Sequence, residues 1–175
     1  MPLRPDNPAW KKLYGALESL AAECGGEFAF VIDAGSRLWC IARTAADLWT
    51  VTRKDGTVVT SKDHRVITTP EGFRDTTTPE VQAADRFYQS EMVPRLMAMR
   101  RGSRVNVEKT EGADRYLAMS FAGIYVLVVW FEEEFPPSAV RALIRRALPE
   151  IEALTLTLPP SGGPGFDVGA QKIRA

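Results

Sequence analysis

Two stretches of this sequence have no polar face, and they constrain the fold more than any other feature. Residues 28–32 read Phe-Ala-Phe-Val-Ile, and residues 124–131 read Ile-Tyr-Val-Leu-Val-Val-Trp-Phe. Both runs are too short to span a bilayer, and their length and flanking glycines favour strands over helices. A strand without a polar face must be covered on both sides. We therefore expect the two strands to pair at the centre of a sheet that lies between helices.

Three helices are predicted from apolar residues that recur at helical spacing. The first spans residues 8–24, between an Asn-Pro start and a Gly-Gly stop. The second runs from about residue 79 to near residue 102, and Pro94 should interrupt it because proline removes an intrahelical hydrogen bond. The last follows residues 136–138. These helices can supply the layers that cover the sheet.

The remaining strands are predicted at residues 38–42, 103–109 and 115–121. Residues 103–109 alternate apolar and polar side chains, and this strand should therefore lie at an edge. The element order α-β-β-(insert)-α-β-β-β-α predicts an α+β fold, with a five-stranded, mainly antiparallel sheet between helices.

Domain boundaries follow from the same pattern. We expect a single domain over residues 1–158, with an inserted hairpin and loop at about residues 44–78. The hairpin is predicted because residues 48–53 and 57–60 flank a Lys-Asp-Gly turn. Residues 159–175, rich in proline and glycine at their start, are expected to be a flexible C-terminal tail.

Composition and motif searches exclude most functional classes. The 22 basic and 22 acidic residues give a net charge of zero, which disfavours a nucleic-acid-binding protein. Cys24 and Cys40 lack CxxC spacing, so we expect buried free thiols and a reducing, cytoplasmic location. His64 is the only histidine and is expected to be a solvated loop residue. Residues 132–134, three glutamates, are expected to be a solvated strand exit.

Enzymatic signatures are absent from the sequence as well. It contains no P-loop, no G-x-G-x-x-G after a strand and no G-x-S-x-G. Nothing in its start reads as a secretory signal, and no apolar run is long enough for a membrane span. We therefore predict no catalytic residue, no metal, no cofactor and no nucleic-acid partner.

Two segments resemble the Roadblock (dynein light-chain) family, within the longin and profilin-like folds. Residues 25–35, Gly-Gly-Glu-Phe-Ala-Phe-Val-Ile-Asp-Ala-Gly, resemble its first helix exit, first strand and Asp-x-Gly hairpin. Residues 116–154 resemble its last two strands and closing helix. Within them, residues 125–131 and 140–147 are similar to bacterial MglB-type regulators of Ras-like GTPases. The insertion at 44–78 has no recognised counterpart.

The resemblance implies a function. It implies a bacterial, cytoplasmic, non-enzymatic regulatory or scaffold subunit. Such a subunit would form a homodimer through the middle helix and the edge strand. Its expected partner is a small Ras-like GTPase. The subunit would have no catalytic activity of its own and would at most activate or co-regulate the nucleotide cycle of that GTPase.

The middle helix and the following strand supply the candidate interface. They combine aromatic residues, methionines and arginines, which are enriched at interface cores. The same helix must also cover the sheet, so some of these side chains could serve only the core. The predicted partner or dimer interface comprises Arg86, Tyr88, Glu91, Arg95, Met99, Arg104, Asn106 and Glu108.

Two other functional classes stay open on the sequence alone. A longin-like or PAS-like small-ligand sensor or adaptor would need a pocket with a few convergent polar groups. The two apolar strands offer almost none, and this hypothesis ranks second. An enzyme ranks last, because no acid-base or nucleophilic constellation could be assembled.

Overall fold

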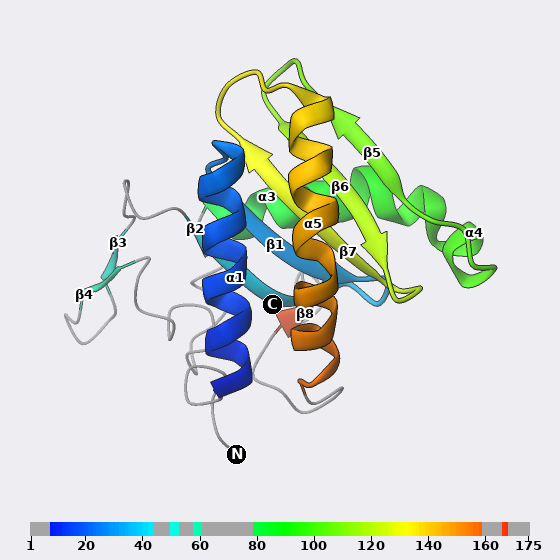
Figure 1. Cartoon of the computed structure of the whole chain (residues 1–175), viewed down its shortest axis with the longest axis horizontal. Coiled ribbons are helices and arrows are strands. Elements are labelled where there is room, and N and C mark those ends of the chain that lie inside the picture. Colours follow the sequence, from blue (N-terminus) through cyan, green and yellow to red (C-terminus); the bar gives the residue numbers. More distant parts are fainter. Residues whose placement is uncertain (1–7, 44–49, 53–57, 61–78, 159–165, 168–175) are drawn as a thin grey trace.

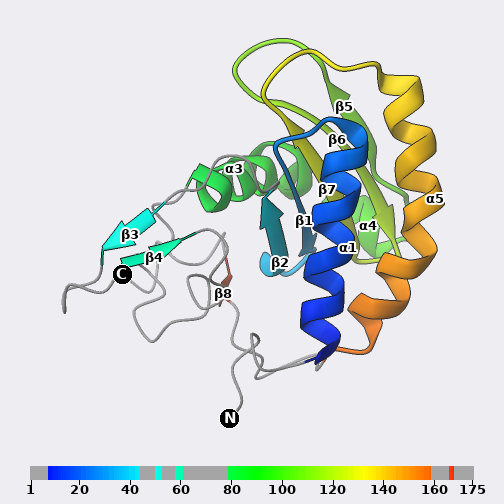
Figure 2. The same ribbon diagram turned by 60° about the vertical axis from the view of Figure 1, so that its left-hand side comes forward.

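The computed structural model describes residues 8–43, 50–52, 58–60, 79–158 and 166–167 of the 175-residue chain. In this part of the chain a six-stranded antiparallel sheet has the order β5-β6-β7-β1-β2-β8. Helices α1 (Pro8–Cys24) and α5 (Pro137–Leu156) lie on one face of the sheet. Helix α3 (Pro79–Phe87) lies on the other face, which gives the three layers visible in Figure 2.

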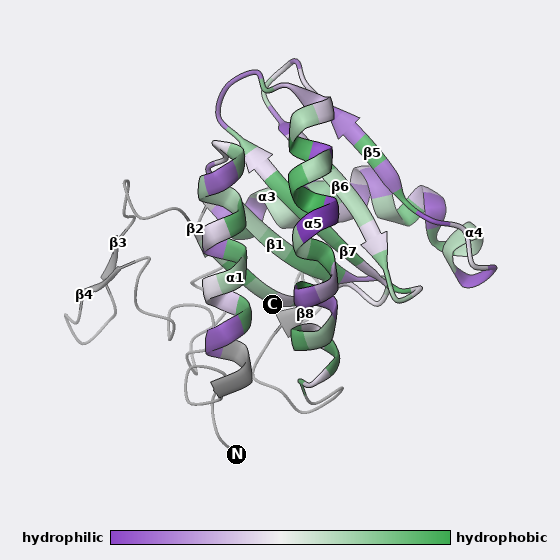
Figure 3. Ribbon diagram, in the orientation of Figure 1, coloured by the Kyte–Doolittle hydropathy of each residue, from purple (hydrophilic) through white to green (hydrophobic). Residues whose placement is uncertain are grey.

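The centre of the sheet confirms the first expectation from the sequence. Strands β1 (Phe28–Asp33) and β7 (Tyr125–Phe131) pair antiparallel, with Phe30 opposite Val128. Every residue of both strands is buried, and both are coloured as hydrophobic in Figure 3. One residue departs from the prediction. Ile124 was expected in the buried strand, but it lies in the turn before β7 and is 47% exposed, because Ala122 and Gly123 turn the chain with positive φ just before it.

The other strands extend the sheet to both sides. β2 (Arg37–Arg43) pairs with β1, and β6 (Arg115–Phe121) pairs with β7. β5 (Asn106–Lys109) lies at one edge, as the alternating pattern predicted, although it begins three residues later than expected. The predicted five-stranded sheet is thus confirmed. A short sixth strand, β8 (Phe166–Asp167), joins its other edge, antiparallel to β2, from the segment expected to be a flexible tail.

The insertion contains the predicted hairpin. Strands β3 (Thr50–Thr52) and β4 (Val58–Thr60) pair antiparallel as a separate two-stranded sheet. The predicted turn at residues 54–56, the part of the insertion from 61 to 78 and, within it, His64 lie outside the described residues.

The end of α1 shows why two glycines stand there. Gly25 adopts a φ of 72°, and its N–H donates to the carbonyl of Ala22 at 3.1 Å. The N–H of Gly26 donates to the carbonyl of Ala21 at 2.7 Å. This pair of bonds is a Schellman C-cap, which requires a left-handed residue at the position of Gly25. The cap redirects the chain into β1.

The hairpin between β1 and β2 is organised by one buried carboxylate. Oδ1 of Asp33 accepts the backbone N–H groups of Gly35 at 2.8 Å and Arg37 at 3.0 Å. Oδ2 accepts the indole N–H of Trp39 at 2.8 Å. An aspartate that bonds the backbone two residues ahead is a common turn former. The Asp-x-Gly sequence therefore fixes both the turn and the position of the Trp39 ring.

Two separate layers of core side chains hold the sheet to its helices. Leu17, Val31, Leu127 and Ile144 belong to the layer under α1 and α5. The layer under α3 contains aromatic side chains, and the rings of Phe87 and Tyr116 meet edge to face at 5.2 Å. Along β6 successive residues alternate between the layers, with Leu117 and Phe121 in the first and Tyr116 and Ala118 in the second. Both cysteines are free thiols, with Cys40 buried and Cys24 partly buried.

Candidate partner interface

The helix that covers the second face of the sheet is interrupted where the sequence predicted. Helix α3 passes into a π-helical turn, Tyr88–Met92, then a 3-10 turn, Val93–Arg95, and ends as the short helix α4, Leu96–Arg100. Pro94 has no N–H to donate to a carbonyl in the preceding turn. The wider π turn and the tighter 3-10 turn accommodate this loss.

This interrupted helix has one buried side and one exposed side. Phe87, Tyr88, Met92 and Met99 are buried against the sheet. On the opposite side, Val93 is 44% exposed and Met97 is 62% exposed. These are two of the four large apolar side chains that are exposed in the described part of the chain. Methionine is a residue type often used at surfaces that bind another protein.

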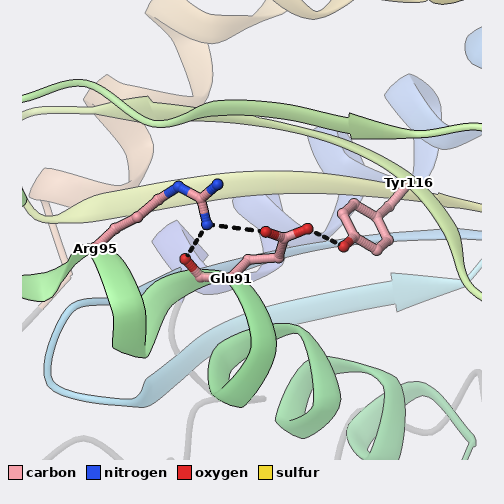
Figure 4. A network of polar contacts seen from close by, with 3 residues as sticks. All are labelled: Glu91, Arg95 and Tyr116. Atoms are coloured by element: carbon pink, nitrogen blue, oxygen red, sulfur yellow. Dashed lines mark hydrogen bonds and ion pairs between the residues drawn. The ribbon is translucent and has the colours of Figure 1, made fainter.

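A polar network ties this helix to the sheet (Figure 4). The hydroxyl of Tyr116, on β6, donates to Oε2 of Glu91. The guanidinium of Arg95 donates to Oε1 of Glu91 at 2.9 Å and to the Glu91 carbonyl at 2.7 Å. Burial, together with the hydrogen bond to Glu91, raises the pKa of Tyr116 above its ordinary value. Tyr116 therefore stays protonated and acts as a hydrogen-bond donor.

A second tyrosine holds the helix at the first residue of the π turn. The hydroxyl of Tyr88 donates to the carbonyl of Ala34, in the β1–β2 turn, at 2.9 Å. In the last turn of α3, the guanidinium of Arg86 makes a bidentate contact with the carboxylate of Asp114, at 3.0 and 3.1 Å. Each of these bonds joins the middle helix to a different part of the sheet.

The edge strand presents a polar outer surface, coloured largely as hydrophilic in Figure 3. Asn106 and Glu108 are exposed, and Glu108 forms an ion pair with Arg141 of α5 at 2.8 Å. The preceding Val105 is buried, and its N–H and carbonyl bond to Ser120 at 2.7 and 2.8 Å. In the described residues no strand pairs with the outer edge of β5. Edge strands of this kind are surfaces on which another strand can pair.

The predicted interface residues divide into two groups. Arg86, Arg104, Asn106 and Glu108 are exposed, and Arg95 and Glu91 are partly exposed within the network. Tyr88 and Met99 instead belong to the core under the helix, and little of their surface is accessible to a partner.

Val93 and Met97, which are exposed on this helix, were not among the predicted interface residues. A signal was available for Met97, because it stands outside the apolar stripe that the helical periodicity defines. Arg100 and Arg101, also exposed, follow on the same helix. Neither arginine forms an ion pair with any of the residues described by the structure.

Metal sites and membrane-spanning helices are absent from the described residues. They contain no group of three or more His, Cys, Asp or Glu side chains that could hold a metal ion. Among the helices in these ranges, none has both the length and the hydropathy of a membrane span. Glu132, Glu133 and Glu134 are all exposed at the exit of β7, as expected from the sequence.

This arrangement of helices and strands has a counterpart among solved structures. The protein is similar in structure to MglB of Myxococcus xanthus, with a TM-score of 0.51 over 89% of this chain and 96% of that one. The two sequences are 16% identical over this match. The protein has a Roadblock/MglB-like fold. No protein-family model matches the sequence, and no curated protein shows significant sequence similarity to it.

The predicted interface lies on two neighbouring elements of this chain. The interrupted helix and the β5 edge are the middle helix and the edge strand that the sequence resemblance had singled out. In the described residues of this chain, the two elements carry exposed apolar side chains, two arginines without an ion pair and a strand edge without a partner strand.

Proposed function

We propose that this protein is a non-enzymatic regulatory or scaffold subunit. It forms a homodimer, binds a small Ras-like GTPase in the bacterial cytoplasm and modulates the nucleotide cycle of that GTPase. The observation that carries the proposal is the exposure of Val93 and Met97 on the helix that precedes β5, whose outer edge has no partner strand in the described residues, on a chain with an MglB-like fold. No arginine is assigned a catalytic role, and the effect on the GTPase would come from contact with its surface.

The pattern of β5 supports a specific arrangement of the dimer. In an antiparallel pair, directly opposite residues share one face of the sheet. With Asn106 opposite its own copy, Val105 of one chain lies opposite Val107 of the other. Arg104 then lies opposite Glu108. This register places the valines on the side of the middle helix and joins opposite charges on the side of α5, where Glu108 already contacts Arg141.

The GTPase is proposed to bind the exposed side of the interrupted helix. Val93 and Met97 supply apolar contact, and Arg100 and Arg101 supply positive charge without an ion-pair partner in the described residues. A complementary partner surface would carry acidic side chains around an apolar centre. Arginine and methionine are among the residue types enriched at such interfaces.

The alternative of a small-ligand sensor gains no support from the described core. The side chains between the sheet and its helices are mainly apolar. Two of the four buried polar residues in the described part of the chain, Asp33 and Thr155, are bonded within their own hairpin and helix, with Thr155 donating to the Ile151 carbonyl at 2.7 Å. We therefore propose only the regulatory function.

Sedimentation and GTPase assays test this proposal. The purified protein is expected to sediment as a dimer at micromolar concentration. It should also co-elute with a Ras-like GTPase from the same genome in one nucleotide state and change its rate of GTP hydrolysis or exchange. The variant Met97→Asp should weaken co-elution, whereas Glu133→Gln, exposed at the opposite end of the sheet, should not. A monomer would contradict the dimer, and unchanged elution and turnover with every such GTPase would contradict the partner.

A further inference from the structure

The interruption of the middle helix divides it into two parts that differ in how firmly they are held. Before the interruption, α3 buries Val81, Ala83, Ala84 and Phe87 against the sheet. After it, residues 96–101 bury only Met99, and Met97, Arg100 and Arg101 are exposed. A segment with few buried contacts opens at a lower free-energy cost than a well-packed one. The second part therefore depends more on its polar bonds.

Those bonds converge on a single side chain. One carboxylate oxygen of Glu91 accepts the hydroxyl of Tyr116 from the sheet, and the other accepts the guanidinium of Arg95 from the next turn. The same Arg95 nitrogen also donates to the Glu91 carbonyl, at 2.7 Å. In a regular helix that carbonyl would accept the backbone N–H four residues ahead. The Arg95 side chain thus bridges the helix at the point where proline disturbs the backbone pattern.

Figure 4 shows the order of these contacts. Tyr116 lies on the sheet, Glu91 lies on the last part of the π turn, and Arg95 lies beyond Pro94. The chain of bonds therefore runs from the rigid sheet, across the interruption, to the start of α4. Short π and 3-10 stretches inside a helix often mark hinges.

We propose that Tyr116, Glu91 and Arg95 form a latch that fixes the direction of residues 93–101 relative to α3. With the latch closed, Val93 and Met97 are held in one orientation on the surface. With the latch open, residues 93–101 move about the interruption while α3 stays on the sheet. Its effect on partner binding rests on the proposed function, but the latch itself is a property of the free protein.

Hydrogen exchange tests the latch, and the chain offers a matched control. Tyr116→Phe removes a hydroxyl that bonds to Glu91, near the end of the π turn, and Tyr88→Phe removes the hydroxyl at the first residue of that turn, which bonds to Ala34. Tyr116→Phe should speed exchange of the backbone amides of residues 96–103 by about tenfold or more, because a hydrogen bond to a charged group is lost. Tyr88→Phe should leave those amides within about twofold of the wild type.

A second variant keeps the test decisive if Tyr116→Phe destabilises the whole domain. Arg95→Met removes the guanidinium of a side chain that is 39% exposed, and it should raise exchange in the same residues. Amides of β1 and β7 report global opening and should be unchanged in Arg95→Met. Equal acceleration in β1, β7 and residues 96–103, or no acceleration in either variant, would overturn the latch.

A binding measurement separates the latch from the proposed function. If wild-type protein binds a GTPase or a second copy, Tyr116→Phe should weaken that association more than Tyr88→Phe does. Equal weakening by the two variants would overturn the proposed control of binding by the latch. If the wild type forms no complex, the proposed function fails, and the exchange data alone decide on the latch.

Discussion

Replacing Asp33 tests how the β1–β2 hairpin is built. Its carboxylate is 8% exposed and accepts three hydrogen bonds, two from backbone N–H groups of the turn and one from the Trp39 indole. A hydrogen bond to a charged group contributes about 1.5–3 kcal/mol, and a buried donor left without a partner costs about 1–3 kcal/mol. The turn amides of Gly35 and Arg37 are nearer to solvent, and water can replace part of their loss.

We expect Asp33→Ala to lower the free energy of unfolding by about 3–4 kcal/mol, and most of this loss comes from the buried Trp39 N–H, which would have no acceptor. Asp33→Asn should cost about 2 kcal/mol, because the amide oxygen can still accept both backbone bonds while its NH₂ group faces the indole N–H. Either loss is a large share of the ~5–15 kcal/mol that stabilises a typical domain.

Urea unfolding at a fixed protein concentration measures these losses, followed by tryptophan fluorescence and circular dichroism. A double-mutant cycle with Trp39→Phe isolates the carboxylate–indole bond, and we expect a coupling of about 1–2 kcal/mol. An Asp33→Ala variant within ~0.5 kcal/mol of the wild type would refute the assignment of the turn to this carboxylate. A coupling near zero would refute the part assigned to Trp39.

Three further predictions follow from particular distances, charges and a pKa. A Cβ at Gly26 would lie 2.9 Å from a backbone carbonyl oxygen of β7, so Gly26→Ala should cost about 1–3 kcal/mol in urea unfolding. A Cβ at Gly15 would meet nothing within 4 Å, and Gly15→Ala should instead stabilise the helix by up to ~1 kcal/mol. Arg104→Glu should weaken the dimer in sedimentation, and Arg104→Glu with Glu108→Arg should restore it; no rescue would contradict the proposed register. Burial, with a smaller effect of the neighbouring glutamate, raises the pKa of Cys24 to about 11. Its alkylation, followed by mass spectrometry, should therefore be slow at pH 8, and its contribution to stability should fall from about pH 9 towards pH 11, where only the unfolded chain readily loses the proton. Alkylation at the rate of an unfolded control would contradict this.

The architecture could be predicted because it depends on apolar runs and on glycine and proline, whose effects are local in the sequence. Residues 28–32 and 125–131 have no polar face, and burial on both sides is their only stable placement. The Gly-Gly stop of α1 and the interruption at Pro94 follow from backbone chemistry within one turn. Each of these features needs no knowledge of what packs against it.

The interface was harder to predict, because a core face and a partner face of one helix use the same residue types. Tyr88 and Met99 are suited to either role, and they prove to belong to the core. Met97 differs from Met99 by only two positions but lies on the opposite side of the helix and is exposed. An interruption at Pro94 was predicted, but the π turn and the 3-10 turn that form it were not. Periodicity could show which residues share a face, but not which residues reach another chain.

The sequence by itself determined the order of the elements, the central pair of strands and the strand that lies at an open edge. These depend on hydrophobic patterning and on glycine and proline, which act over a few residues. The tertiary structure alone decided that Tyr116 reaches Glu91, 25 positions away, and that Asp114 reaches Arg86, 28 positions away. Such contacts leave no periodic trace, because they depend on how the sheet and the interrupted helix lie against each other. They also determine which side chains of the interrupted helix remain exposed on the surface.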